Sequence, residues 1–267
     1  MDPTHKHPAA GYAPGFVSDV FDAARAAGKV FAIAGLQGTG KSTLSLQLQA
    51  LGRDRGLTVV PLSIDDFYLG HAERQRLGRE IHPVCATRGV PGTHDPALAC
   101  AVIDALAQGR PATLPRFDKI ADDRLPESAW PRVDHADLVV LEGWFLKVPP
   151  QAPGDLDDPL NRLERDEDPD GTWRRWSNQC LANDYPPLWE RLPRMWFLQG
   201  PGFDIVPKWR WQQEQTLQAR HPDRSAMTHP QVMHFVQFFE RVSRQAMQTL
   251  PAIAERTIRL DAERQPI

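Results

Sequence analysis

Short apolar runs alternate with helical patterns along most of the chain. Runs that are apolar at consecutive positions are typical of strands buried on both faces of a parallel sheet. They predict strands at 30–34, 58–63, 138–141, 195–198 and 257–260. Because helical patterns separate these runs, we expect an α/β fold, a three-layer sandwich with a central, mainly parallel, five-stranded sheet.

Apolar side chains recur at helical spacing between the predicted strands. Those between 16 and 24 predict a first helix that stops near Gly28, and leucines four and three positions apart predict a helix over about 41–55. A third pattern covers 232–242. Helices therefore precede and follow the first strand, as a sheet covered on both faces requires.

Three stretches depart from this alternation. Residues 1–14 are rich in Pro, His, Gly and Ala and predict a flexible leader. Proline-rich, acidic sequence at about 148–172 predicts an exposed excursion without a regular buried element. A helix at about 204–220 follows the fourth strand and is the expected lid. We therefore interpret 15–267 as a single domain with a mobile lid.

Composition narrows the classes of partner. The 267 residues carry a formal charge of -3 at pH 7, so we expect no general attraction to nucleic acid or to an anionic membrane. No apolar run approaches the roughly 20 residues of a membrane-spanning helix, and the N-terminus lacks the layout of a secretion signal. These features predict a cytoplasmic protein, and they do not indicate its oligomeric state.

The three cysteines, Cys85, Cys100 and Cys180, are widely spaced and form no C-x-x-C pair. An odd number of cysteines in this pattern indicates neither a disulfide framework nor a zinc site. The cysteines therefore give no indication of the chemistry of the chain.

A glycine-rich motif lies where the first strand meets the following helix. The segment 35–42 reads GLQGTGKS and matches G-x-x-x-x-G-K-[ST]. Its backbone N–H groups and the helix dipole favour phosphate, while Lys41 reaches the β- and γ-phosphates and Ser42 is expected to ligate Mg²⁺. The residues expected to bind the nucleotide are Gly35, Leu36, Gln37, Gly38, Thr39, Gly40, Lys41, Ser42 and Thr43.

The nucleotide is expected to be ATP with Mg²⁺. The chain lacks the [NT]-K-x-D tetrapeptide with which GTPases recognise guanine. The motif itself is shared by kinases, GTPases, motor ATPases and regulators, so it indicates the phosphate donor and leaves the acceptor open.

Acidic residues follow two of the predicted strands. Asp65 and Asp66 come after the second strand and Glu142 after the third, at the edge of the sheet where parallel folds bind ligands. We expect Asp65 to accept the proton of the acceptor hydroxyl, Asp66 to support the site and Glu142 to join Ser42 at Mg²⁺. Alternatively, the two aspartates cap the next helix and Glu142 pairs with a lysine.

Two segments between these strands are rich in cations and rigid turns, RGVPGTHD at 88–95 and PRFDK at 115–119. Arginines in such a cluster can hold an anionic acceptor through bidentate contacts, whereas each charge alone is typical of an exposed surface. The residues expected to bind the acceptor are Asp66, Tyr68, Arg88, Thr93, His94, Arg116 and Lys119.

The expected lid helix begins with KWRWQQE. Arg210 is the candidate for a lid arginine that neutralises the transferring phosphoryl group, and it joins Asp65 and Lys41 as a catalytic candidate. Trp209 and Trp211 are expected to pack, because nothing else indicates a nucleic-acid surface.

The motifs occur in the order GLQGTGKSTL, SIDDFYL, RGVPGTHD, PRFDK with DDR close behind, LEGW, WRWQQE and MTHPQVMHFV. This set resembles the D-glycerate 3-kinase family of P-loop kinases, which is related to phosphoribulokinase, uridine kinase and pantothenate kinase. The resemblance implies ATP-dependent phosphorylation of D-glycerate to 3-phosphoglycerate. It also places the catalytic carboxylate at Asp65 and gives Arg88 or Arg116 a substrate carboxylate to bind.

Two alternatives stay open. The same scaffold could phosphorylate pantothenate, a nucleoside or a sugar phosphate, although the segment 88–95 favours glycerate. A nucleotide-dependent regulator that hydrolyses ATP to change shape is the alternative from a different class. Such a regulator would respond to a macromolecular partner, whereas a kinase would respond to a small-molecule acceptor.

Overall fold

A five-stranded sheet forms the centre of the computed structural model, which describes residues 11–26, 28–220 and 226–267. Its strands are β1 (Val30–Gly35), β2 (Val59–Ser63), β7 (Leu138–Gly143), β8 (Met195–Gln199) and β9 (Arg256–Arg259). They lie in the order β2-β7-β1-β8-β9, and every neighbouring pair is parallel. The predicted sheet is confirmed. Residues 1–10 of the expected leader at 1–14 lie outside the described residues. The expectation of a flexible leader is wrong for 11–14, because Tyr12 is buried and a helix begins at Pro14.

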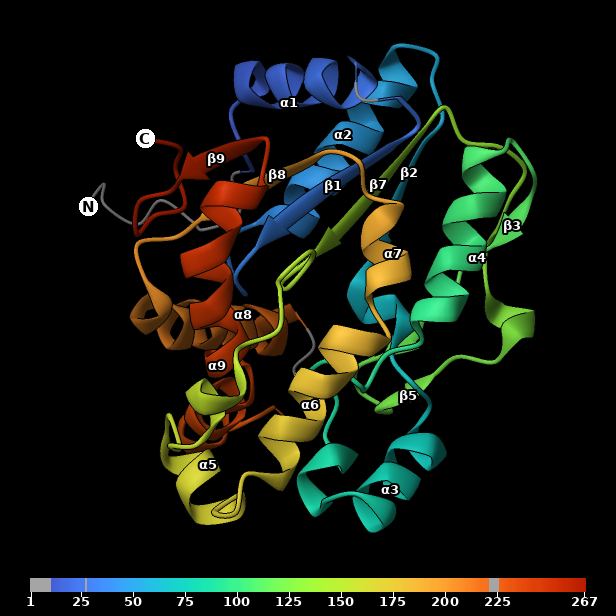
Figure 1. Cartoon of the computed structure of the whole chain (residues 1–267). Helices are drawn as coiled ribbons and strands as arrows, with labels where there is room; N and C mark the ends of the chain where they lie inside the picture. The colour runs from blue at the N-terminus through green and yellow to red at the C-terminus, as the bar shows by residue number, and fades with distance from the viewer. Residues whose placement is uncertain (1–10, 27, 221–225) are drawn as a thin grey trace.

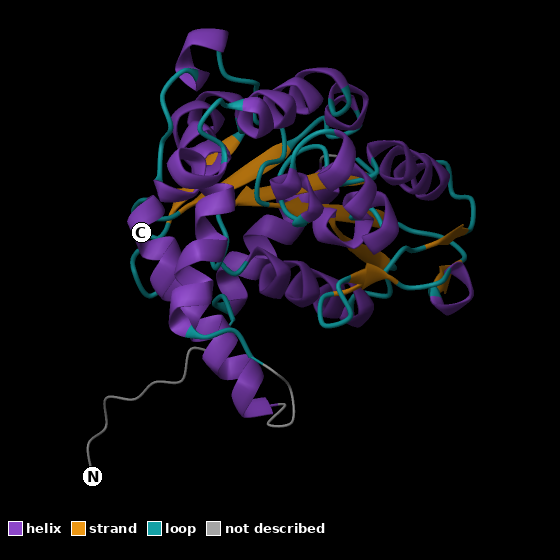
Figure 2. Ribbon diagram, turned by 90° about the horizontal axis from the view of Figure 1, so that it is seen from below, coloured by secondary structure: helices purple, strands orange, loops and turns teal. Residues whose placement is uncertain are grey.

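Helices cover both faces of this sheet, as the edge-on view in Figure 2 shows. They are α1 (Pro14–Ala26), α2 (Lys41–Asp54), α3 (His71–Glu80), α4 (Pro96–Ala107), α5 (Arg162–Glu167), α6 (Thr172–Asn183), α7 (Pro186–Glu190), α8 (Val206–Arg220) and α9 (His229–Ile253). Figure 1 shows α1 and α2 on one side of the sheet and α4, α7 and α9 on the other. None of the helices in the described part of the chain has the length and apolar character of a membrane span.

Side chains of β1 alternate between two hydrophobic cores. Phe31 and Ile33 pack with α1 and α2, where they meet Leu44, whereas Ala32 and Ala34 face the core under α4 and α9. All four are fully buried. A strand covered on both faces reads as a continuous apolar run, which explains why the sequence pattern identified it.

Two small antiparallel sheets flank the central one, and the hydrophobic pattern did not predict them. One pairs β3 (Ala112–Thr113) with β6 (Arg132–Val133), and the other pairs β4 (Phe117–Asp118) with β5 (Asp123–Arg124). Strands of two residues are too short to show the alternation on which strand prediction depends. The β4–β5 hairpin nevertheless carries the candidate acceptor residue Lys119, and Arg116 directly precedes it.

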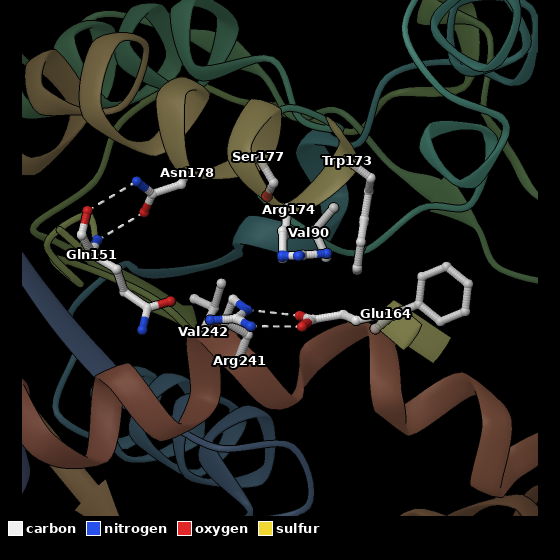
Figure 3. A pocket seen from close by; sticks show the side chains of 10 residues that line it. Val90, Gln151, Glu164, Trp173, Arg174, Ser177, Asn178, Arg241 and Val242 are labelled. Carbon is white, nitrogen blue, oxygen red and sulfur yellow. Dashed lines mark hydrogen bonds and ion pairs between the residues drawn. The ribbon is translucent and has the colours of Figure 1, made fainter. Parts of the chain in front are cut away.

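The expectation of an exposed excursion at about 148–172 is wrong for part of this stretch. It contains α5, and both Glu164 and Asp168 are almost fully buried. Arg241 donates to both carboxylate oxygens of Glu164 at 2.7 and 2.6 Å (Figure 3), and Arg174 donates to Asp168 at 3.0 Å. Buried acids are tolerated here because buried or partly buried arginines neutralise them.

A cavity of about 20 Å³ lies between α6, α9 and this stretch, with the side chains of Arg174, Glu164 and Arg241 in its wall (Figure 3). That volume holds about one water molecule. Ser177 in the same wall donates to the carbonyl oxygen of Pro91 at 3.0 Å. Ser177 therefore supports the loop at 88–95 from behind, and the cavity is too small for a substrate.

The expected lid helix at about 204–220 corresponds to a short 3₁₀ turn followed by α8. The N-terminal half of α8 packs against the glycine-rich turn through Trp209, which is fully buried. Helix formation thus agrees with the expectation, while mobility of this helix stays a prediction.

Candidate active site

The glycine-rich turn at 35–42 connects β1 to α2 in a conformation that needs glycine. Gly38 and Gly40 have φ angles of 84° and 88°, in the left-handed region that L-side chains rarely adopt. A Cβ atom on Gly38 would lie only 2.6 Å from the Cβ of Trp209. No side chain caps the start of α2 at Gly40, so the first amides of the helix face an uncapped end suited to an anion.

Lys41, Ser42 and Glu142 meet at the carboxyl edge of the sheet. The Ser42 hydroxyl donates to Oε1 of Glu142 at 2.7 Å, and Nζ of Lys41 lies 4.0 Å from Oε2 of the same carboxylate. Nζ of Lys41 also donates to the carbonyl oxygen of Leu36 at 3.3 Å. Burial lowers the pKa of Lys41, while Glu142 and Asp65 oppose that change. The lysine expected to pair with Glu142 in the alternative interpretation is thus Lys41 itself.

The position of β7 explains why these groups converge. Glu142 pairs in register with Ile33 of β1 on one side and with Ser63 of β2 on the other. Residues that follow β1 and β2 therefore emerge on either side of Glu142. The glycine-rich turn and Asp65 occupy these two places.

Asp65 lies in a 3₁₀ turn, Ile64–Phe67, whose start is capped by Ser63. Its carboxylate accepts from Nζ of Lys119 at 2.7 Å and from the Tyr68 hydroxyl at 3.0 Å. Burial by itself raises the pKa of Asp65, but the charge and hydrogen bond of Lys119, with a contribution from Lys41, hold that pKa well below its usual range. Asp65 is therefore ionised and belongs to the same electrostatic site as Lys41.

Asp66 points to a different cation from Asp65. Its Oδ2 atom lies 3.3 Å from Nη1 of Arg116. Burial raises the pKa of Asp66, against the opposing charge of Arg116. The structure thus separates two neighbouring carboxylates into different environments, and their expected roles stay predictions.

Arg88 holds the β4–β5 hairpin in place. Nη1 of Arg88 donates to Asp122, and its Nη2 donates to the carbonyl oxygen of Lys119 at 3.2 Å. Arg74, which is fully buried, also pairs with Asp122. Much of the hydrogen-bonding capacity of Arg88 therefore goes to the chain itself, where it fixes the loop that presents Lys119 to Asp65.

Thr93 is used inside its own loop. Its hydroxyl donates to the carbonyl oxygen of Val90 at 2.7 Å and accepts from the N–H of Gly89 at 3.0 Å. The side chain is fully buried. These contacts assign Thr93 to the shape of the loop at 88–95, and they leave little of its hydroxyl for an acceptor.

His94 stacks on Tyr68 with the ring centroids 4.4 Å apart. Its Nδ1 lies 3.0 Å from the Tyr185 hydroxyl, which already accepts from the N–H of Gly92. If the Tyr185 hydroxyl donates to Nδ1, the proton of His94 lies on Nε2. Burial lowers the pKa of His94 to about 3, so the ring is neutral. Among the described residues its Nε2 has no hydrogen-bond partner.

Comparison with known proteins shows the family to which the chain belongs. No family model matches the sequence. The chain is 32% identical over 224 residues to the uncharacterized kinase mug58 of Schizosaccharomyces pombe, covering 79% of this chain and 78% of that protein. The chain belongs to this kinase family. It is also 30% identical over 255 residues to the chloroplastic D-glycerate 3-kinase of Arabidopsis thaliana, covering 86% of this chain and 52% of that protein.

The chain thus spans about half the length of the Arabidopsis protein. A solved D-glycerate 3-kinase structure from Cryptococcus neoformans has the same fold, with a TM-score of 0.75, 24% identity and 95% coverage of each chain. The resemblance noted in the sequence is therefore confirmed, and the chain is a P-loop kinase.

In this kinase, Arg210 lies on α8 beside the helix α9. Its guanidinium is 3.3 Å from the carboxylate of Glu214 and 5.8 Å from the centroid of the Phe235 ring. Glu214 in turn accepts from the N–H of Met227 at 3.0 Å. The described contacts therefore place Arg210 in a network that joins the two helices, and its expected role at the phosphoryl group stays a prediction.

Two further residues contact the glycine-rich turn, and sequence reasoning missed both. The Tyr12 hydroxyl donates to the carbonyl oxygen of Thr39, and Nε of Arg264 donates to the carbonyl oxygen of Gly38. Arg264 is 226 positions from Gly38 along the chain. No local spacing rule could have connected residues so far apart.

Proposed function

We propose that this kinase transfers the γ-phosphoryl group of ATP to the hydroxyl of a small hydroxy acid, with D-glycerate as the acceptor and 3-phosphoglycerate as the product. The electrostatic coupling of Lys41 with Asp65 carries the proposal, because it joins the phosphate-binding lysine and the candidate base in one site. The names of the Arabidopsis and Cryptococcus kinases support the choice of acceptor.

The donor half holds the triphosphate. The amides at the start of α2 and the Nζ atom of Lys41 face the phosphates, and Lys41 neutralises charge on the transferred group. Arg210 is proposed to assist from α8. Because α8 is anchored to the turn by Trp209, the lid arginine and the phosphate cradle belong to one packed unit.

Ser42 and Glu142 fit a magnesium site. Their oxygen atoms lie 2.7 Å apart in the structure, and hydroxyl and carboxylate oxygens are the ligands that Mg²⁺ prefers. When bound, the ion neutralises charge on the phosphate oxygens. We propose that Ser42 contacts it directly and that Glu142, paired with the Ser42 hydroxyl here, acts on it through water.

Asp65 is the proposed base. It takes the proton of the acceptor hydroxyl while the oxygen of that hydroxyl bonds to the γ-phosphorus. The bond from the γ-phosphorus to the β–γ bridging oxygen breaks, and ADP leaves with the electron pair. The Tyr68 hydroxyl donates to Asp65 and fixes the orientation of its carboxylate.

The ion pair between Lys119 and Asp65 bears on the acceptor class. Lys119 is 60% exposed at the end of its hairpin, and the nearby carboxylate raises its pKa, so it stays charged. A bound acceptor with its own carboxylate offers Lys119 a second anion and frees Asp65 to accept a proton. We therefore propose that Lys119 and Arg116 hold the acceptor carboxylate, with Nε2 of His94 as a neutral donor, and that Arg88 positions the hairpin.

An acceptor screen tests this proposal. ADP release from ATP is measured with D-glycerate, other small hydroxy acids, pantothenate, nucleosides and sugar phosphates, each against a control without acceptor. D-Glycerate is expected to give the largest stimulation. Stimulation by a nucleoside or pantothenate alone would contradict the assignment of D-glycerate as the acceptor. ADP release that is independent of every acceptor would favour an ATP-dependent regulator.

A further inference from the structure

The outer side of the glycine-rich turn is held by side chains from opposite ends of the described chain. Nε of Arg264 donates to the carbonyl oxygen of Gly38 at 2.6 Å. The Tyr12 hydroxyl donates to the carbonyl oxygen of Thr39 at 2.5 Å. Neither donor belongs to the G-x-x-x-x-G-K-[ST] motif.

These contacts act on the part of the turn that is richest in glycine. Gly38 and Gly40 flank Thr39, and glycine loses more backbone freedom on ordering than any other residue. In a planar peptide the C=O and N–H bonds point in opposite directions. Holding the carbonyl of Thr39 outward therefore fixes the direction of the Gly40 N–H. Holding the carbonyl of Gly38 fixes the peptide whose N–H belongs to Thr39, and that N–H donates to the carbonyl oxygen of Leu36 at 3.3 Å inside the turn.

Tyr12 is itself held firmly against α2. Its backbone N–H donates to Oε1 of Gln47 at 3.0 Å, and Nε2 of Gln47 donates back to the Tyr12 carbonyl oxygen at 2.8 Å. Burial raises the pKa of Tyr12 well above its usual range, so the hydroxyl remains a donor. The ring also lies within 3.3 Å of the position that a Cβ atom on Gly40 would occupy.

Arg264 connects the turn to α8. Its Nη2 donates to Oε1 of Gln212 at 2.9 Å, and its guanidinium lies over the Trp209 ring, 5.0 Å from the centroid. The Trp209 indole N–H donates to the carbonyl oxygen of Ala262 at 2.9 Å, which fixes the segment that follows β9 at the sheet edge in Figure 1.

The backbone of Arg264 supports a special role for this position. Its φ angle is 67°, in the left-handed region, where a residue other than glycine is strained. Such strain persists only where surrounding contacts impose it. Here the backbone N–H of Arg264 donates to the carbonyl oxygen of Asp261 at 3.1 Å, and the side chain adds the hydrogen bonds to Gly38 and Gln212 and the stacking on Trp209.

We propose that Arg264 and Tyr12 are positioning residues that preset the glycine-rich turn for the triphosphate of the nucleotide. They act through the backbone of Gly38 and Thr39 and contact neither the adenine nor the acceptor. This inference rests on the proposed binding of ATP at the turn. It predicts that phosphate affinity depends on two side chains at the far ends of the described chain.

The test compares binding of ATP and of inorganic triphosphate, each with Mg²⁺, by calorimetric titration of the full chain. Arg264→Met removes the donors and keeps the aliphatic bulk, and it is expected to weaken both ligands by about 10- to 100-fold. Tyr12→Phe removes one hydroxyl and is expected to weaken both by about 3- to 10-fold. Arg264→Lys, which keeps the charge and one donor, is expected to recover part of the affinity.

Arg256→Met is the matched control, because Arg256 also stacks on a tryptophan, Trp196, at 4.9 Å but lies on β9 away from the turn. It is expected to leave both affinities unchanged, and thermal unfolding of each variant is measured alongside. With turnover assays, Arg264→Met is expected to raise the KM for ATP while kcat at saturating ATP changes by less than about 3-fold.

Three results would overturn the inference. Equal losses in Arg264→Met and Arg256→Met would assign the effect to general stability. A loss for ATP without a loss for triphosphate would make Arg264 a contact of the nucleoside. Unchanged affinities in both Arg264→Met and Tyr12→Phe would remove the positioning role. If the unmodified protein binds neither ligand, the proposed binding of ATP is contradicted, and the inference that rests on it is contradicted as well.

Discussion

The donor half and the acceptor half of this site are built in different ways. The proposed donor half centres on the continuous segment at 35–42, where packing sets the directions of the backbone amides that we expect to bind phosphate. The acceptor half is assembled from side chains on the 3₁₀ turn after β2, the loop at 88–95 and the β4–β5 hairpin. The two halves meet at Lys41, Glu142 and Asp65.

This difference predicts how each half responds to change. In the proposed donor half, hydrogen bonds hold the carbonyl oxygens of Gly38 and Thr39, so we expect the turn to be preset before the nucleotide binds. In the acceptor half, carboxylates and cations neutralise one another: Lys119 with Asp65 and Arg116 with Asp66. An anionic acceptor that binds there is therefore expected to replace a carboxylate in one of these ion pairs. Substitutions in the donor half should change nucleotide binding, whereas those in the acceptor half should change turnover or acceptor affinity.

The largest effect is expected for Asp65→Asn. The amide cannot take the acceptor proton, so turnover should fall on the order of 10²- to 10⁴-fold, while the affinity for ATP changes little. The measurement is kcat at saturating ATP and D-glycerate, together with an ATP titration. Asp66→Asn is the neighbouring control and should lose far less. A crippled Asp66→Asn beside an active Asp65→Asn would exchange the roles of the two acids.

Lys41→Met should follow, with turnover reduced on the order of 10²- to 10³-fold, because a charge that stabilises the transferred group is removed. Unlike the substitution at Asp65, it should also weaken ATP. Lys147→Met is a suitable control, since Nζ of Lys147 bonds only a carbonyl oxygen in the described contacts, that of Leu192 at 3.0 Å. Activity of Lys41→Met close to that of the unmodified protein would refute the assignment of the phosphate cradle.

Glu142→Gln should act on the metal dependence of the donor half. Loss of the carboxylate charge next to Ser42 should raise the Mg²⁺ concentration for half-maximal activity by about 10- to 100-fold. Saturating Mg²⁺ should restore much of the rate. An unchanged Mg²⁺ requirement would show that Glu142 pairs only with Lys41 and takes no part in holding the ion.

Lys119→Met is expected to have the smallest effect, about a 5-fold increase in the KM for D-glycerate, because the side chain is largely exposed. The KM for ATP should stay the same, which is what separates this half from the other. Equal increases in the KM for ATP and in the KM for D-glycerate would contradict the division of the site into a donor half and an acceptor half.

The same variant should shift the pH profile. Lys119 is the strongest influence that lowers the pKa of Asp65, and without it burial raises that pKa. The base is active when ionised, so the acidic limb of kcat/KM for the acceptor should move to higher pH. A limb that stays in place would show that Asp65 is not the group that titrates.

The elements that hold the donor half could be predicted from the sequence because their signals are local. The run at 30–34 is apolar because both faces of β1 are covered, and the motif at 35–42 follows it directly. Asp65 and Glu142 could be placed at the same sheet edge because both follow strands of a parallel sheet. The two acids lie close together because β2 and β7 are neighbours in the sheet.

The rest of the site depends on contacts between distant segments. Nothing in the sequence around Lys119 shows that it reaches Asp65, 54 positions earlier, or that Arg88 is occupied by Asp122. The hydroxyl of Thr93 was expected at the acceptor, yet it closes its own loop. Side-chain pairing of this kind is decided by tertiary packing and leaves no periodic pattern.

The most direct test of the account is the identity of the product. The protein is incubated with ATP, Mg²⁺ and D-glycerate, and the products are identified by phosphorus and carbon NMR. We predict ADP and 3-phosphoglycerate in equal amounts, with the phosphoryl group on the terminal hydroxyl oxygen. ADP accompanied by inorganic phosphate, or a phosphoryl group on another position or acceptor, would contradict the account.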